Sequence, residues 1–203
     1  MVSSGELFPE TWRPESLGPD AIPYLWPTFF AIYPAKCDLF QLVDWQRSIC
    51  QRETAVVQKR PPNLLHVSVV ECGKPKQKRQ PLPEALAEAQ RYFSFPAFDM
   101  VFDSVAHFGR ADRAFVAVAN VASQEMFKGL RTAVADAQRR AGIFASRGKH
   151  EAHLTLGYAD GIPKERRNIE PFRFRVDAIE LVASDRGKSH HERLERWALY
   201  KTS

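Results

Sequence analysis

"LLHVSVV" at residues 64–70 and "EAHLTLGY" at residues 151–158 are the two stretches that decide the fold. Each contains a histidine, an aliphatic residue, a hydroxyl residue and a second aliphatic residue, in that order. Successive side chains of a β-strand point to opposite faces, so each stretch, as a strand, has one polar and one apolar face. The apolar faces can pack in a core, whereas unpaired imidazoles and hydroxyls cost free energy to bury.

The polar face of the first strand carries His66 and Ser68. The polar face of the second strand carries His153 and Thr155. By the same alternation Val70 continues the first polar face and would end it with an apolar wall. One triplet of this type arises by chance in many proteins, but here each half of the chain has one. We therefore expect both strands to line one central groove.

The remaining sequence alternates between strand-like and helix-like segments. Apolar residues at helical spacing predict three helices, at residues 37–52, 82–93 and 123–142. In the last of these we expect Ser123 to be the N-cap and Gly142 to end the helix. Alternating apolar residues predict an early strand at residues 24–34 and a hairpin at residues 97–121. They also predict a closing antiparallel pair, formed by residues 171–184 and 193–201.

This order of elements indicates an α+β protein with mixed sheets and helices on the outside. Each half delivers its histidine strand soon after a helix, which suggests a rough internal duplication. Residues 1–25 contain four prolines and no apolar periodicity, and we expect them to form an irregular acidic arm. Residues 26–203 are expected to form a single bilobal domain.

The composition is that of a globular protein with 203 residues and a net charge of +5. No stretch approaches the length of an apolar membrane span, and the N-terminus does not read as a signal peptide. Cys37, Cys50 and Cys72 are odd in number and read as reduced thiols of a cytoplasmic protein. The basic residues after the arm suggest an anionic partner such as RNA or a nucleotide. We expect a monomer.

The two polar faces suit phosphoester cleavage without a metal or cofactor. One imidazole can remove a proton from the attacking water while the other protonates the departing oxygen, each contributing about 10²–10⁴-fold. The two hydroxyls can donate hydrogen bonds to the non-bridging phosphoryl oxygens, where charge builds up. The residues alone leave open which histidine is the acid.

These motifs resemble those of the two-histidine (2H) phosphoesterase superfamily, whose hallmark is a pair of His-x-Thr/Ser-x motifs. The resemblance is to its LigT-like branch, the RNA 2′,3′-cyclic phosphodiesterases, also called 2′-5′ RNA ligases. It covers most of residues 26–200 and includes "FFAIYP" at 29–34 and "FDSVAHFGRADRAFVAV" at 102–118. The chain departs from the family pattern at Ala152, where proline is common, and at Gly157-Tyr158, where arginine is common.

The resemblance implies a pseudo-twofold fold in which two antiparallel sheets face a central groove. It also implies hydrolysis of a 2′,3′-cyclic phosphate, on an RNA 3′ end or a small nucleotide, to a 2′-phosphate. His66 would then be the proton donor and His153 the proton acceptor. Ser68 and Thr155 would bind the phosphate.

Two other functions remain open. The chain could be a non-catalytic RNA- or nucleotide-binding module of the same fold, or a structural protein. In the binding module, affinity for RNA would depend on salt and not on the two histidines.

Several other residues have a structural and a functional interpretation. His150 and His153 form an H-x-x-H pair, but residues three apart on a strand face opposite sides, so we expect no zinc site. We interpret His190-His191 as a solvated turn, and Tyr158 and Phe30 as core aromatics rather than base-stacking residues. The basic residues of two loops could contact a phosphate or an RNA backbone, or simply be solvated: Lys74, Lys76, Lys78 and Arg79, and Arg147 and Lys149.

Overall fold

The computed structural model describes most of the chain after residue 27. The described residues are 28–53, 55, 57–73, 86–108, 114–141, 145, 150–159, 165–185 and 190–201. The expected N-terminal arm at residues 1–25 lies outside them, so its conformation remains a prediction. Among the described residues, no helix has the length and hydrophobicity needed to cross a membrane. Cys37, Cys50 and Cys72 are all free thiols.

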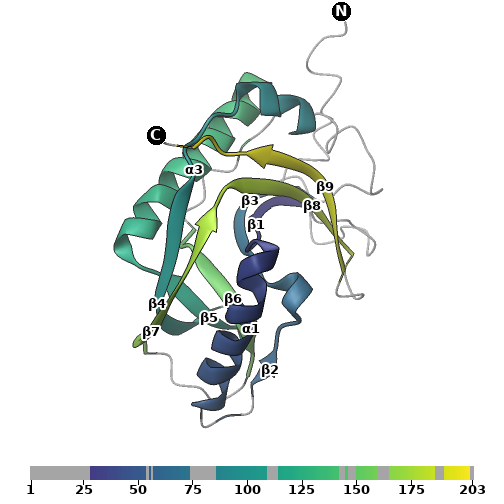
Figure 1. Ribbon diagram of the computed structural model, residues 1–203. Helices are drawn as coiled ribbons and strands as arrows, with labels where there is room; N and C mark the ends of the chain where they lie inside the picture. The colour runs from purple at the N-terminus through teal and green to yellow at the C-terminus, as the bar shows by residue number, and fades with distance from the viewer. Residues whose placement is uncertain are drawn as a thin grey trace, which may run out of the picture.

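The strands form two sheets in which every pair is antiparallel (Figure 1). The four-stranded sheet has the order β3-β1-β8-β9, with bounds Val67–Gly73, Thr28–Ile32, Ala178–Asp185 and His190–Ala198. The five-stranded sheet has the order β2-β6-β5-β4-β7, with bounds Gln58–Lys59, His153–Tyr158, Ala114–Ala119, Phe98–Phe108 and Arg167–Val176. The predicted α+β class is confirmed, and the two motif strands, β3 and β6, lie in different sheets.

Two long helices cover the sheets, with bounds Lys36–Gln51 for α1 and Val121–Arg140 for α3. The α1 helix contacts β2, β6 and β7, whereas α3 contacts β3 and β4. Two short 3₁₀ helices, η3 and η4, have the bounds Pro62–Leu64 and Ala89–Tyr92. Of the helix expected at residues 82–93, the first four residues lie outside the described chain, and the rest is helical only from Leu86 to Tyr92.

The N-cap predicted for α3 is wrong by three residues. Asn120 is the N-cap, and its side-chain oxygen accepts a hydrogen bond from the backbone N–H of Ser123. The Ser123 hydroxyl instead accepts from the backbone N–H of Val101, which anchors the start of α3 to β4. Asparagine and serine are both good caps, so the choice depends on this tertiary contact.

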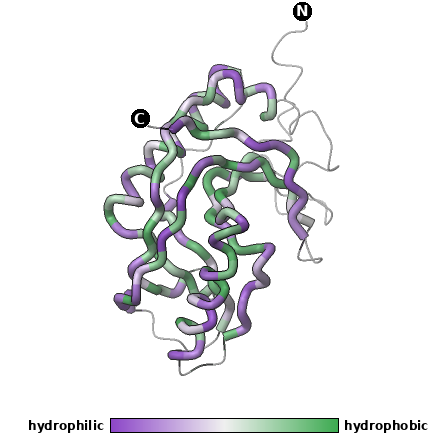
Figure 2. Tube along the Cα trace, in the orientation of Figure 1, coloured by the Kyte–Doolittle hydropathy of each residue, from purple (hydrophilic) through white to green (hydrophobic). Residues whose placement is uncertain are grey.

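The main hydrophobic core lies between the sheets and the helices. Its largest fully buried side chains include Trp197 and Phe30 of the four-stranded sheet and Phe102 and Phe115 of the five-stranded sheet. Phe30 is therefore a core residue, as predicted. Hydrophobic and hydrophilic residues alternate along the chain trace (Figure 2), as expected for strands and helices that each bury one face.

The closing antiparallel pair differs from the prediction. Residues 167–176 form β7, which pairs with β4 in the five-stranded sheet. Only Asp177 separates β7 from β8, and β8 pairs with β9 in the other sheet. The chain thus passes from one sheet to the other within a segment that reads in sequence as a single strand (Figure 1).

A register shift in β3 changes the role of Val70. Ala31 pairs with Ser68, but Phe30 pairs with Val70, so one extra residue is accommodated in β3. Such a bulge breaks the strict alternation of side chains. Val69 and Val70 are both buried in the main core. Val70 therefore does not wall the polar face of β3, contrary to the expectation.

The β6 strand contains a glycine that no larger residue can replace without movement. A Cβ atom at Gly157 would lie 2.6 Å from the backbone oxygen of Gln58 and 2.6 Å from a methyl group of Val57. We expect Gly157→Ala to lower the free energy of unfolding by about 1–3 kcal/mol, because the β2 backbone must shift. Urea unfolding followed by circular dichroism measures this.

The matched control is Gly129→Ala in α3, where the new methyl group meets only the end of the Phe95 ring, at 3.2 Å. The alanine also gains up to about 1 kcal/mol of helix propensity. Equal losses for the two variants would contradict the close approach of β2 to β6.

Candidate functional site

The two motif segments meet although no ladder joins their strands. The β3 and β6 strands contact each other. Arg131 of α3 donates from Nε to the carbonyl oxygen of Val69, at 2.9 Å, and reaches the carbonyl oxygen of His150 with Nη1, at 3.5 Å. The segments that carry His66 and His153 are therefore held together at one place.

Each motif histidine is oriented by the same local hydrogen bond. His66 Nδ1 lies 2.7 Å from the carbonyl oxygen of Leu64, and His153 Nδ1 lies 2.8 Å from that of Glu151. A carbonyl oxygen can only accept, so Nδ1 carries the proton in both neutral rings. Nε2 of each ring is therefore free to accept a proton. In both cases the carbonyl that fixes the ring belongs to the residue two positions before the histidine.

The hydroxyl groups lie on the same faces as the histidines, as predicted. Ser68 Oγ is 3.1 Å from His66 Nε2, and because that nitrogen is unprotonated the serine hydroxyl donates. Thr155 is half-buried on the β6 face that carries His153, while Leu154 and Leu156 are fully buried on the other.

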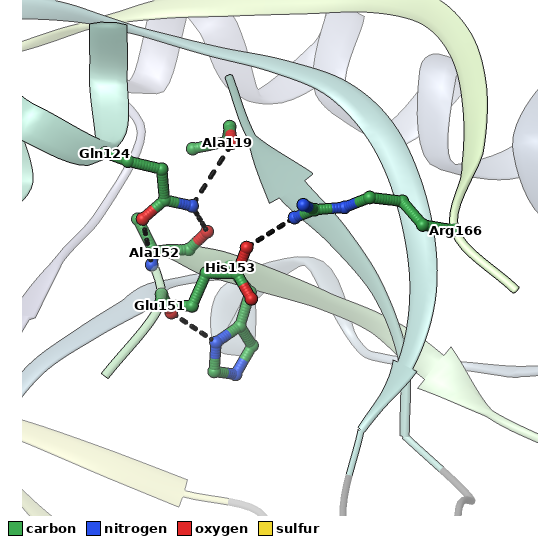
Figure 3. A network of polar contacts seen from close by, with 6 residues as sticks. All are labelled: Ala119, Gln124, Glu151, Ala152, His153 and Arg166. Atoms are coloured by element: carbon green, nitrogen blue, oxygen red, sulfur yellow. Dashed lines mark hydrogen bonds and ion pairs between the residues drawn. The ribbon is translucent and has the colours of Figure 1, made fainter. Parts of the chain in front are cut away.

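An amide side chain from α3 holds the backbone that leads into β6 (Figure 3). Gln124 accepts from the backbone N–H of Ala152 at 2.9 Å and donates to its carbonyl oxygen at 3.1 Å. It also donates to the carbonyl oxygen of Ala119 on β5, at 3.1 Å. This places His153 relative to α3 and β5. On the other side of His153, Arg166 pairs with the carboxylate of Glu151.

The charges around the two histidines differ. Burial lowers the pKa of His66 to about 3, against the hydrogen bond to the Leu64 carbonyl, which raises it. The charge of Arg60, and that of His191 and His153 when they are protonated, lower it further. Burial also lowers the pKa of His153, but the carbonyl and carboxylate groups of Glu151 oppose this shift. Both rings are therefore neutral near pH 7 in the ligand-free protein. His153 is among the groups that lower the pKa of His66, which is consistent with the two imidazoles lying near one site.

Each motif histidine has a second histidine beside it. The His191 ring lies 4.9 Å from that of His66, and the His150 ring lies 5.0 Å from that of His153. Interpreting His190-His191 as a solvated turn was wrong for His191, which belongs to β9 and is half-buried. His150 precedes β6, so strand alternation does not separate it from His153 as we had expected.

Three aromatic rings surround His66. Phe29 and Tyr33 of the β1 segment lie 5.5 and 5.6 Å from it, centroid to centroid, and His191 completes the group. The Tyr33 hydroxyl lies 2.8 Å from His191 Nδ1, and the guanidinium of Arg193 lies 4.0 Å above the Tyr33 ring. Sequence analysis missed Tyr33 and His191. Strand alternation from Phe29 through Ala31 to Tyr33 could have indicated the first, but no local pattern indicates the second.

Arg60 is a further residue that sequence analysis missed. Its Nε donates to the carbonyl oxygen of Leu64, at 2.8 Å, which is the same oxygen that His66 Nδ1 contacts. Its Nη1 donates to the hydroxyl of Tyr158, at 2.7 Å. Tyr158 is 43% exposed, so its interpretation as a core aromatic is wrong. The basic residues at positions 74–79, 147 and 149 lie outside the described residues.

No group of three or more histidine, cysteine, aspartate or glutamate side chains is placed to hold a metal ion within the described ranges. His150 and His153 lie side by side, yet the same ranges supply no third ligand. The groups that these residues bring together are the two motif imidazoles with a second histidine beside each, the two hydroxyls and nearby guanidinium groups.

The comparisons with known proteins identify one family. The model of the 2′-5′ RNA ligase superfamily matches residues 43–188, which include both motifs. No curated protein matches the chain.

Solved structures of similar fold cover most of the chain. LigT of E. coli, solved with NADP⁺, is 18% identical, with a TM-score of 0.64 over 86% of this chain and 98% of LigT. The same protein solved with 3′-AMP is 20% identical over the same shares, also with a TM-score of 0.64. A protein of Thermus thermophilus is 18% identical, with a TM-score of 0.59 over 85% of this chain and 97% of its own. At these identities the likeness establishes the fold, which is the predicted LigT-like fold.

The buried histidines should make the fold sensitive to acid. The folded-state pKa values of His66, at about 3, and of His191, at about 4, lie below the ordinary value of about 6.5. Between pH 6.5 and 5 the unfolded chain therefore binds protons that the folded chain does not, and stability falls as the pH falls. Urea unfolding at several pH values measures the slope.

Replacing one of these rings, as in His66→Gln, should reduce the slope by up to about 1.4 kcal/mol per pH unit. An unchanged slope in this variant would mean that His66 titrates alike in the folded and unfolded chains.

Proposed function

The chain belongs to the 2′-5′ RNA ligase superfamily, and we propose that it is a metal-independent cyclic phosphodiesterase. Its substrate would be a 2′,3′-cyclic phosphate, on an RNA 3′ end or a small nucleotide, and its product a 2′-phosphate. One observation carries the proposal. Two histidines, one just before β3 and one at the start of β6, are each fixed at Nδ1 by the carbonyl two residues earlier, and each lies beside a hydroxyl residue of its strand.

The reaction needs a base and an acid. In the proposed direction, His153 Nε2 accepts a proton from a water molecule, whose oxygen forms the new bond to phosphorus. The bond from phosphorus to the 3′ oxygen breaks, and protonated His66 Nε2 delivers its proton to that oxygen. Hydrolysis leaves the phosphate on the 2′ oxygen, and the two histidines have exchanged protonation states.

The negative charge of the substrate is part of this scheme. With a pKa of about 3 in the ligand-free protein, His66 is not protonated near pH 7. A bound phosphate beside the ring favours the imidazolium, because an opposite charge at close range stabilises the charged form. In the same step the Ser68 hydroxyl turns from His66 Nε2 to a phosphoryl oxygen.

The relatives support a ligand of nucleotide size. LigT of E. coli was solved with NADP⁺ and with 3′-AMP, and both of these contain phosphate on a nucleoside. Phe29 and Tyr33 beside His66 offer apolar surface to the nucleoside portion of such a ligand.

The first test removes the two imidazoles. We expect His66→Ala and His153→Ala each to reduce kcat on a 2′,3′-cyclic nucleotide by about 10²–10⁴-fold, measured in EDTA. A 4-nitrophenyl phosphodiester, whose leaving group needs no proton, separates the roles: the variant lacking the acid should recover activity on it, and the variant lacking the base should not.

His190→Gln, at an exposed position of β9, is the matched control and should retain activity. Recovery by His153→Ala instead of His66→Ala would reverse the proposed roles. Nucleotide binding without turnover by the unsubstituted protein would make the chain a binding module of the same fold.

The second test concerns the hydroxyls. We expect Ser68→Ala and Thr155→Val each to lower kcat by about 10²-fold, because each removes a donor to the charged phosphoryl oxygens. Ser68→Thr and Thr155→Ser keep the donor and should retain most of the activity. If Ser68→Thr and Thr155→Ser lowered kcat as much as Ser68→Ala and Thr155→Val do, altered packing rather than a lost hydrogen bond would explain the loss.

A further inference from the structure

Arg60 is an ordered cation next to His66. Its guanidinium is held by the Leu64 carbonyl and the Tyr158 hydroxyl. Its backbone is fixed as well, because its N–H donates to the carbonyl oxygen of Leu156, at 2.9 Å, and its own carbonyl accepts from the amide of Gln46, at 3.0 Å. Both acceptors of the guanidinium are neutral groups.

Most arginines of the described chain instead face a carboxylate. Examples are Arg47 with Asp44, Arg167 with Glu53, Arg193 with Glu180 and Arg196 with Asp177. Within the described ranges Arg60 has no such ion pair, and its Nη2 atom has no hydrogen-bond partner. Its charge acts instead on the imidazoles, where it adds to burial in lowering the pKa of both His66 and His191. An ordered guanidinium without a carboxylate partner is suited to a phosphate.

His191 offers a second donor at the same place. The Tyr33 hydroxyl has one hydrogen-bond partner among the described residues, His191 Nδ1. Burial raises the pKa of Tyr33, so the hydroxyl keeps its proton. We take this hydroxyl as the donor to Nδ1. In that arrangement the neutral His191 ring carries its own proton on Nε2, which has no acceptor in the described part of the chain.

These donors lie beside the reacting end of His66, not at it. Nε2 of His66 points to Ser68, whereas Arg60 sits at the carbonyl that holds Nδ1. The His191 ring stands at 70° to the His66 ring, 4.9 Å away. A phosphate bound by Arg60 and His191 is thus a different group from the one that His66 Nε2 would act on.

We propose that Arg60 and His191 form a binding site for a second phosphate group of the substrate. This rests on the proposed function and narrows it: the preferred substrates carry a phosphate one ribose away from the cyclic phosphate, as a nucleoside 2′,3′-cyclic phosphate with a 5′-phosphate does. Arg193 is not part of this site, since it is committed to Glu180 and to the Tyr33 ring.

The experiment compares adenosine 2′,3′-cyclic phosphate with its 5′-phosphorylated form. We expect the 5′-phosphate to raise kcat/KM of the unsubstituted protein by about tenfold or more, as a charge-assisted bidentate contact should. Arg60→Gln should abolish this gain. His191→Leu should reduce it, whereas His191→Gln, which keeps an N–H donor, should reduce it less.

Arg47→Gln is the matched control, because it removes an equal charge from an arginine that is already paired, and it should keep the full gain. Two results would overturn the site. One is no gain in the unsubstituted protein. The other is an equal loss on both substrates in Arg60→Gln, which would make Arg60 a residue that positions His66 or binds the reacting phosphate.

Binding without turnover separates this proposal from the proposed function. Calorimetric titration compares adenosine 2′-phosphate with adenosine 2′,5′-bisphosphate. Tighter binding of the bisphosphate that depends on Arg60 supports the second-phosphate site even in a protein that hydrolyses nothing. Equal affinities in a protein that does hydrolyse the cyclic phosphate would overturn the site and leave the phosphodiesterase intact.

Discussion

The site depends on hydrogen bonds from helix side chains to the backbone of the two motif segments. The β3 and β6 strands belong to different sheets, so no ladder sets their separation. Arg131 of α3 fixes the segment of Val69, and Gln124, on the same face of that helix, fixes that of Ala152. A half-buried amide that satisfies both a donor and an acceptor of one residue is a stiff connection, because breaking it leaves several polar groups unpaired. The α3 helix thus acts as the common reference for both motifs.

The two halves of the chain orient their imidazoles in the same way. In each half the histidine stands at or just before the start of a strand and donates from Nδ1 to the carbonyl two residues earlier. This contact needs only local backbone geometry, so it forms in both halves whatever surrounds them. The surroundings do differ: His66 lies among aromatic rings and guanidinium groups, and His153 lies beside the carboxylate of Glu151. The same Nδ1 hydrogen bond thus orients two imidazoles whose surrounding charges differ. Such a pair is suited to the proposed roles of acid and base.

Sequence could predict what depends on local periodicity. Alternation separated the polar and apolar faces of β6, and helical spacing located α1 to within one residue at each end. Prediction from sequence failed where a tertiary contact determines the position of a side chain. The bulge in β3 comes from pairing with β1 and moves Val70 into the core. His191 reaches His66 only because β8 and β9 extend the sheet that contains β3. The local sequence "SHHE" does not predict this strand order. The same holds for Arg60, whose partners Leu64 and Tyr158 lie on two different segments.

The single residue between β7 and β8 has a mechanical consequence. Both neighbouring strands are committed to ladders in different sheets, and the carbonyl of Asp177 is itself engaged by the N–H of Leu199, at 2.8 Å. Any shear of one sheet against the other must therefore be absorbed by rotation about the bonds of this one residue, which is how short hinges work. Asp177 thus couples the two sheets that contain the motif strands, although no contact joins it to either motif histidine within the described residues.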